Sequence, residues 1–425
     1  MRGKTTAWLC AAVLTVSTVF SGCSDKQSVV NYEEQQEEIT TITFFGNKYE
    51  PENVTVIEEI ISSFMKENPE IRVSYESLKG NGYYEALEKR MAAGKGDDVF
   101  MVNHDAVLSL QEDGKLLDLS EMDTISDYTD QMLGQMEEDG KIYWVPTTVS
   151  VFGLYCNTDL LTEHGYKVPD NLNEWEEICD GFVEKGITPV IANNDISLKT
   201  LAIGRGFFKA YQEGRQEEVF EKLNDGTAQL SEYLTEGFTL AEEFIKKGYI
   251  DAAKALNTEK TSDDLLEFAK GESPFMLTGG WAAQRVSQME PGFVFEVAPL
   301  PALEDGTFEV INADTRLSVN AEGEHTDAAL KFVEFFTQKE NIQKFADQQS
   351  SFSPLKGGGA SSVMEVQPLI PCYQSGCTVI GADGHLDVKI WSITAEVSKK
   401  ILSGDPVSAA MQWMDQQVDE ERGTP

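Results

Sequence analysis

The sequence predicts an α/β protein with two lobes joined by a hinge, and three observations lead to this prediction. The chain has 425 residues, too many for one comfortable hydrophobic core. Strand patterns alternate with amphipathic helix patterns along most of it. Between two such alternations lies a β-branched and aromatic run, residues 143–160, with no charge before Asp159. The run predicts a buried strand that links two α/β units, although it also fits an ordinary core strand of one large domain.

The first alternation begins after residue 38. A helix opening at Pro51 would place Ile57, Ile60, Ile61 and Phe64 on one face, and the pair Asn68-Pro69 would end it. This pattern favours a largely parallel sheet with helices on both faces. Strands are expected at residues 39–45, 71–75 and 98–102, and further helices at residues 83–91 and from about 105.

The second alternation follows the uncharged run and contains a long helical region. Its longest amphipathic stretch covers residues 230–247. Gly279-Gly280-Trp281 predicts a turn between a strand and a helix. Strands are expected at residues 189–192, 273–278, 293–298 and 311–319, and helices at 158–163, 173–185, within 198–270, and at 325–337, 388–402 and 406–417.

Charge and motif content exclude several classes of function. The formal net charge is −38, and excess acid of this size argues against nucleic-acid binding because phosphates would be repelled. The charge fits a chain that stays monomeric. The sequence has no G-x-S-x-G, H-E-x-x-H, P-loop or C-x-x-C motif, and its four histidines are scattered singly. We therefore expect no catalytic residues, no metal site and no cofactor.

The N-terminus carries the most specific local signal. Arg2 and Lys4 precede an apolar stretch, residues 7–20, that is too short for a stable membrane span. Ser21-Gly22-Cys23 follows and resembles a bacterial lipobox, although Phe20 stands where leucine is usual. The resemblance implies a signal peptide at 1–22 and a Cys23 lipidated with a chain such as palmitate. Residues 23–38 are then a flexible, acidic tether. A plain secretory signal with an incidental cysteine is the alternative.

Four cysteines remain after Cys10 and Cys23. Cys372 and Cys377 enclose a short loop and are close enough in sequence to form a small ring. Cys156 and Cys179 fall on apolar faces, which favours buried thiols. The pairing stays open, because four cysteines permit three connectivities.

Four local motifs carry a resemblance that covers residues 39 to about 417. They are Thr43-Phe-Phe-Gly-Asn47, Asp97-Asp-Val-Phe-Met-Val-Asn-His-Asp105, Gly140-Lys-Ile-Tyr-Trp-Val-Pro146, and Phe268-Ala-Lys-Gly-Glu-Ser-Pro-Phe-Met-Leu-Thr-Gly-Gly-Trp281. In this order they resemble the extracellular solute-binding proteins of carbohydrate ABC importers, the maltose-binding-protein-like group.

The resemblance implies a two-lobed periplasmic-binding-protein-like (type II) fold with a hinge and an interlobe cleft. The N-terminal lobe would hold residues 39–149 and 313–355, and the C-terminal lobe residues 150–312 and 356–425. The implied protein is a non-enzymatic, lipid-anchored receptor on the outer face of a cell membrane, of Gram-positive type. It would hand a sugar or oligosaccharide to the permease subunits of an ABC importer.

The candidate ligand residues lie where an open α/β sheet binds ligands, after the carboxyl ends of strands, or at the crossings between the lobes. Asp105 as a hydroxyl acceptor and Trp281 as a stacking surface match family ligand positions, as does Trp391, for which a core position is the alternative. Asn47 and Asn103 fit helix capping as well as ligand contact. An ion pair is the alternative for Asp314 and Arg316. The complete predicted set is Phe45, Asn47, Asn103, His104, Asp105, Ser150, Trp281, Asp314, Arg316 and Trp391.

Two other functions compete with sugar capture. Paired carboxylates in a cleft would serve an extracellular glycoside hydrolase. A lipoprotein that senses or adheres would use the same two lobes without a permease. Trp144 and Trp175 are assigned to packing, and Phe152, on the linking strand, favours a core position.

Overall fold

The computed structural model describes residues 39–422, which belong to one compact unit. The predicted signal peptide, Cys23 and the tether lie outside these residues. Among the described helices, none is long and apolar enough to cross a membrane. The predicted lobe boundaries stay a prediction.

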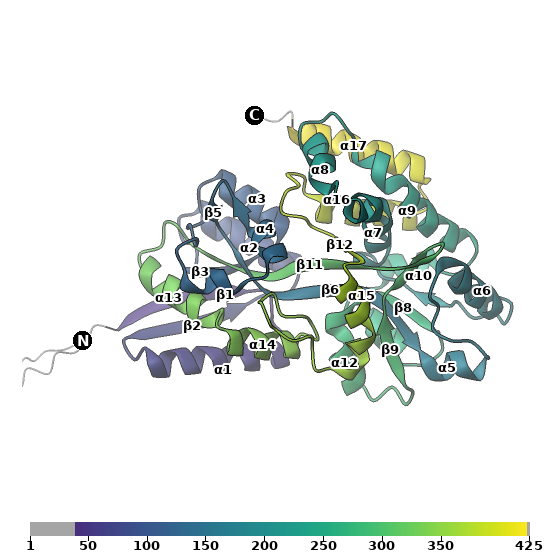
Figure 1. Ribbon diagram of the computed structural model, residues 1–425, viewed down its shortest axis with the longest axis horizontal. Coiled ribbons are helices and arrows are strands. Elements are labelled where there is room, and N and C mark those ends of the chain that lie inside the picture. The colour runs from purple at the N-terminus through teal and green to yellow at the C-terminus, as the bar shows by residue number, and fades with distance from the viewer. Residues whose placement is uncertain (1–38, 423–425) are drawn as a thin grey trace, which may run out of the picture. The chain divides into compact units, whose positions relative to one another are not determined.

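One mixed sheet runs through the described chain in the order β2-β1-β3-β11-β6-β8-β7. Its two central strands are β6 (Val145–Asn157) and β11 (Gly306–Val319), which pair antiparallel with Val149 opposite Ala313. Figure 1 shows them side by side, with β1 to β3 toward one end and β8 and β9 toward the other. Every residue of β6 is buried, as its uncharged sequence predicts. The chain passes this point a third time at Phe352, whose backbone pairs with that of Val149.

The elements around β1 to β3 form the first part of the fold. β1 pairs in parallel with both β2 and β3, as the sequence predicts. Figure 1 shows α1, α13 and α14 on one side of these strands and α2, α3 and α4 on the other. The bounds are β1 Thr40–Gly46, α1 Pro51–Glu67, β2 Ile71–Ser77, α2 Asn81–Ala92, β3 Val99–Val102, α3 His104–Glu112, η1 Asp123–Asp127, α4 Asp130–Met136, β4 Glu137–Glu138, β5 Lys141–Ile142, α13 Thr326–Phe336 and α14 Lys339–Gln348.

The remaining elements gather around the other ends of β6 and β11. A second cluster of buried apolar side chains lies here and includes Trp175, which is fully buried as predicted. The bounds are α5 Thr158–Glu163, α6 Leu172–Val183, β7 Val190–Ile191, α7 Ile196–Gln212, α8 Gln216–Asn224, α9 Leu230–Lys246, α10 Ala252–Asn257, α11 Asp263–Phe268, β8 Phe275–Gly279, η2 Gly280–Ala282, α12 Ala283–Gln288, β9 Phe295–Ala298, β10 Leu300–Leu303, η3 Met364–Leu369, α15 Ile370–Ser375, β12 Thr378–Ile380, α16 Ile390–Leu402 and α17 Val407–Arg422.

Two expectations need correction. The sheet as a whole is not largely parallel, because β11 runs antiparallel to β3 and β6, and β6 runs antiparallel to β8 and β9. β6 and β11 are neighbours that cross the sheet in opposite directions, so they form an antiparallel pair. Seven short helices and strands were also not predicted from the sequence, all of ten residues or fewer: α4, β4, β5, β10, β12, α14 and α15. The four cysteines of the described chain are free thiols, and the Cys372 thiol donates to the Cys377 carbonyl oxygen.

Glu309 on β11 gives the first testable prediction. Its side chain is fully buried, and burial raises its pKa to about 9. The folded state therefore keeps a proton that the unfolded chain releases near pH 4.5. Stability should fall as pH rises from about 5 to about 9, by up to about 1.4 kcal/mol per pH unit. Glu309→Gln should remove this slope and melt at a higher temperature than the wild type at pH 8.

The matched control is Glu58→Gln, because Glu58 is an exposed residue of α1. Thermal melts of the three proteins between pH 5 and 8.5 give the measurement. A slope that persists in Glu309→Gln would contradict the assignment of the raised pKa to Glu309.

Candidate functional site

A cavity of about 620 Å³ lies over the central strands. Its lining comes from the loops after β1 and β3, from β6 and β11, from η2 and α12, and from the start of α16. Segments that are far apart in sequence therefore meet at one place. Of the ten predicted ligand residues, nine line the cavity: Asn47, Asn103, His104, Asp105, Ser150, Trp281, Asp314, Arg316 and Trp391.

Phe45 is the exception among the predicted residues. Its side chain is fully buried, and its ring packs 4.5 Å from that of Tyr83 with the Arg90 guanidinium 4.0 Å above it. β1 alternates its side chains between two faces, and Phe45 points into the core. This placement does not support a ligand contact by Phe45.

The loop between β3 and α3 brings three predicted residues to the cavity. The Asn103 side chain accepts from the Ala106 backbone, so Asn103 caps α3 as the alternative interpretation expected. The cap fixes Asp105 in the first turn, where it is nine-tenths buried. His104 lies beside it with Nε2 3.3 Å from the Val388 carbonyl oxygen, and burial lowers the pKa of this imidazole.

Three buried polar atoms in the cavity lack a hydrogen-bond partner among the described residues. They are Asn47 Oδ1, Asp105 Oδ1 and Ser150 Oγ. The other oxygen of Asp105 accepts from the backbone and hydroxyl of Ser392, and Asn47 Nδ2 donates to the Tyr84 hydroxyl. Burying such atoms without partners costs about 1–3 kcal/mol each, so they are suited to a ligand that donates hydrogen bonds.

Three aromatic side chains form a continuous surface in the same cavity. Phe152 of β6 lies between two tryptophans, with ring centroids 5.0 Å from Trp281 and 5.3 Å from Trp391. A Cβ on Gly279 would lie 2.1 Å from the Trp281 ring, so only glycine admits the ring there. Packing of Phe152 was predicted, but its place between the tryptophans was not.

Arg316 is a buried cation at the β11 crossing. It donates to the carbonyl oxygens of Ala313 and Ala382, and its guanidinium lies 3.8 Å above the Trp144 ring. Burial lowers its pKa to about 10, while Asp314 and Asp105 oppose that shift. No carboxylate of the described residues lies within ion-pair distance of Arg316, so the alternative of an Asp314–Arg316 ion pair is wrong.

Polar contacts join the two sides of the cavity. Glu50, which precedes α1, pairs with Arg285 of α12 at 3.3 Å. At the surface Lys79 pairs with Glu259 at 2.7 Å. The contact between Asp105 and Ser392 is a third link of this kind.

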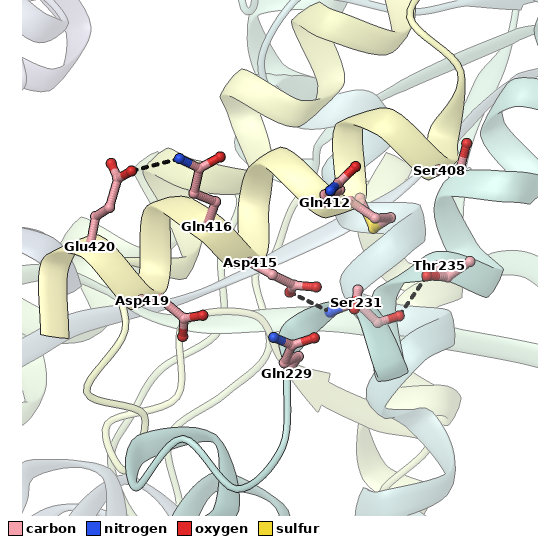
Figure 2. A pocket seen from close by; sticks show the side chains of 10 residues that line it. Gln229, Ser231, Thr235, Ser408, Gln412, Asp415, Gln416, Asp419 and Glu420 are labelled. Carbon is pink, nitrogen blue, oxygen red and sulfur yellow. Dashed lines mark hydrogen bonds between the residues drawn. The ribbon is translucent and has the colours of Figure 1, made fainter. Parts of the chain in front are cut away.

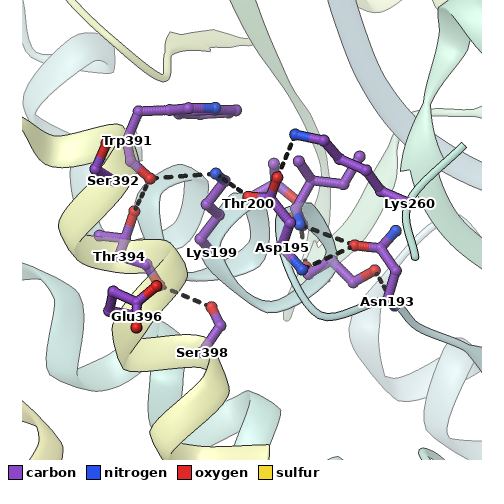
Figure 3. Close-up of polar contacts among 12 residues, drawn as sticks. Asn193, Asp195, Lys199, Thr200, Lys260, Trp391, Ser392, Thr394, Glu396 and Ser398 are labelled. Atoms are coloured by element: carbon purple, nitrogen blue, oxygen red, sulfur yellow. Dashed lines mark hydrogen bonds and ion pairs between the residues drawn. The ribbon is translucent and has the colours of Figure 1, made fainter. Parts of the chain in front are cut away.

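A buried charge cluster that was not predicted from the sequence lies beside Trp391. Lys199 of α7 is 1% exposed and bonds Asp195 at 2.5 Å, and Asp195 also pairs with Lys260 (Figure 3). Although burial opposes it, the two ammonium groups hold the pKa of Asp195 below its ordinary value. The sequence does contain a signal for this cluster: Lys199 interrupts the apolar stretch of residues 196–203 and follows Asp195 by four residues. Lys48, Asn312 and Gln349 also line the cavity and were not predicted.

A second cavity, of about 700 Å³, lies between α9 and α17 (Figure 2). Its lining is polar apart from Met411 and includes no aromatic residue. The backbone of Ser231 donates to Asp415 across it at 3.1 Å. No cluster of His, Cys, Asp and Glu that could hold a metal ion occurs in residues 39–422.

Comparison with known proteins identifies the class. The family model "Bacterial extracellular solute-binding protein" matches residues 48–343, and the chain belongs to this family. The chain is 24% identical to the multiple sugar-binding protein of Streptococcus mutans over 83% of each chain. It is also 24% identical to a maltooligosaccharide ABC transporter solute-binding lipoprotein of Streptococcus pneumoniae, over 80% of this chain and 78% of that one.

Among solved structures, the solute-binding protein RafE in complex with raffinose matches with a TM-score of 0.72 at 22% identity. The match covers 90% of this chain and 99% of RafE. The predicted two-lobed type II fold is thereby confirmed. The family binds solutes outside the cell, so the chain is a binding protein and the hydrolase alternative is set aside.

The contribution of Arg316 to stability can be tested by substitution. Arg316→Met should lower the free energy of unfolding by about 2–4 kcal/mol, because two buried carbonyl oxygens lose their donor. Urea unfolding at pH 7 measures the loss. Arg72→Met is the control, since Arg72 is exposed on β2, and it should stay within about 0.5 kcal/mol of the wild type. If Arg316→Met lowers the free energy of unfolding no more than Arg72→Met does, the contacts of Arg316 contribute little to stability.

Proposed function

We propose that this protein captures a sugar or oligosaccharide in the 620 Å³ cavity and delivers it to the permease subunits of an ABC importer. The observation that carries the proposal is the tryptophan pair flanking Phe152 beside three unpartnered buried polar atoms. A sugar ring has C–H faces that suit an aromatic plane and hydroxyls that donate to such atoms.

The relatives support the same ligand class. The streptococcal proteins are named for sugars and maltooligosaccharides, and RafE holds raffinose. Asp105, Trp281 and Trp391 would contact the sugar directly, with Asn47, Ser150 and Arg316 beside them. Asn103, His104 and Asp314 complete the proposed site.

The location of the protein follows from the N-terminus. Cys23 would carry the lipid, residues 24–38 would tether the folded part, and the monomeric receptor would face outward on a Gram-positive membrane. The lipoprotein of Streptococcus pneumoniae supports this arrangement. The two lobes, residues 39–149 with 313–355 and residues 150–312 with 356–425, would close on the sugar about the strand crossings.

Titration calorimetry with raffinose, maltotriose and glucose tests the ligand class. At least one of these sugars should bind, and Trp281→Ala should weaken its binding by about 2 kcal/mol or more, because the ring face loses its partner. Asp105→Asn should weaken binding by about 1–3 kcal/mol, since a buried acceptor is partly replaced by a donor.

The control is Trp413→Ala, because Trp413 lies on α17, packs against Lys400 and does not line the cavity. It should bind as the wild type does. Unchanged affinity in Trp281→Ala would remove this residue from the site, and a failure of all three sugars to bind would overturn the proposed ligand class.

Membrane anchoring is tested separately. Cys23→Ser should move the protein from the membrane fraction to the soluble fraction of expressing cells, because each buried CH₂ of the lipid contributes roughly 0.8 kcal/mol. Cys10→Ser is the control and should leave the protein in the membrane. Equal membrane retention of Cys23→Ser would contradict the lipoprotein assignment.

A further inference from the structure

Lys199 occupies an unusual position beneath the aromatic surface of the cavity. Its side chain is 1% exposed, and its Nζ lies 4.1 Å from the centroid of the Trp391 ring. The same Nζ donates to the Trp391 carbonyl oxygen at 3.2 Å and to Asp195 at 2.5 Å. Figure 3 shows the ammonium directed to Trp391 from α7. One cation therefore contacts both the backbone and the ring of the same tryptophan.

Phe152 and Gly381 also restrict the position of the Trp391 ring. Phe152 packs against its ring at 5.3 Å and 51°, and a Cβ on Gly381 would approach the ring to 3.0 Å. Because Lys199 covers one face of the ring, the other face is the one that a ligand in the cavity can reach. These contacts restrict the Trp391 side chain before any ligand binds. The loss of side-chain entropy on binding is therefore small.

We propose that Lys199 is a positioning residue that clamps Trp391 for stacking against the sugar, with Asp195 holding the clamp in place. The proposal rests on the proposed function, because it assumes that a sugar occupies the cavity. Nothing in the relatives' names assigns a role to this lysine.

The charge of Lys199 makes the clamp sensitive to pH. Burial lowers the pKa of its ammonium to about 8, against the opposing effect of Asp195. Below pH 8 the charged amine attracts the indole face, and above it the attraction is lost. Sugar affinity should therefore be highest near pH 7 and fall toward pH 9. The charged and titratable groups that line the cavity on the elements around Lys199 are Asp195 before α7, Lys260 before α11, His104 and Asp105 on α3, and Lys389, Glu396 and Lys399 at α16.

A fluorine signal tests the clamp without any sugar. The protein is labelled with 5-fluorotryptophan, and the Trp391 resonance is assigned as the one that Trp391→Phe removes. In the wild type this resonance should shift with pH with a midpoint near 8. In Lys199→Met, which keeps the length of the stem and leaves Asp195 paired with Lys260, the shift should disappear. A Trp391 resonance with the same position and the same pH dependence in Lys199→Met as in the wild type would overturn the clamp.

Binding of raffinose and maltotriose at pH 7 and pH 9 gives the second readout. The wild type should bind more weakly at pH 9, whereas Lys199→Met should bind about tenfold more weakly than the wild type at pH 7 and show no pH dependence. The control is Lys222→Met, which breaks an exposed i,i+4 pair with Glu218 away from the cavity and should match the wild type.

The outcomes separate the two proposals. If none of raffinose, maltotriose and glucose binds to the wild type, the proposed ligand class fails while the fluorine signal still decides the clamp. If the wild type binds and Lys199→Met binds equally well at both pH values, the proposed function stands and the positioning role of Lys199 is overturned.

Discussion

The antiparallel pairing of β6 with β11 is the interaction on which the rest of the structure depends. The two strands are 13 and 14 residues long, and the pairs run from Phe152 opposite Val310 to Val145 opposite Leu317. All of β6 is buried, so its backbone groups must find partners within the protein. β11, β8 and β9 provide them, and Phe352 adds a third crossing at Val149. The strands thereby tie the two groups of elements together at the floor of the cavity.

This pairing also explains why the cavity residues occur where they do. Ser150 faces Asn312 across the ladder, and Asp314 and Arg316 follow two and four residues further on the same strand. Between them Thr315 adopts a φ of 44°, a strained value for a β-branched residue. The Thr147 hydroxyl donates to the Thr315 carbonyl oxygen at 2.8 Å, and the Asp314 carboxylate accepts from the Thr315 amide at 2.7 Å. These bonds offset part of the backbone strain, which costs about 1–3 kcal/mol. The distortion coincides with the place where the chain is predicted to return between the lobes.

Much of this architecture could be predicted from the sequence because long elements have a clear period. The helix from Pro51, the helix at residues 158–163 and the uncharged strand were all placed to within a few residues. β10 and β12 have four and three residues and leave no period to detect. For the site, Asp105 and Trp281 were found because they follow strand ends, whereas Lys199 lies inside a helix and acts through a tertiary contact with Trp391. Phe45 was wrongly included because strand position alone does not say which face a side chain takes.

Charge distribution separates the cavity from the rest of the molecule. The chain has 72 acidic and 34 basic residues, whereas the cavity lining has nine acidic and eight basic residues. Most of the basic residues that line it are paired internally, such as Arg285 with Glu50 and Lys199 with Asp195. A charged ligand would gain little from groups that already have partners. An uncharged, hydroxyl-rich ligand instead uses the atoms left over. Asn47 Oδ1 and Asp105 Oδ1 accept hydrogen bonds, and the Ser150 hydroxyl both donates and accepts. Selection in this cavity therefore rests on hydrogen bonding and stacking, while the acidic exterior keeps the chain soluble.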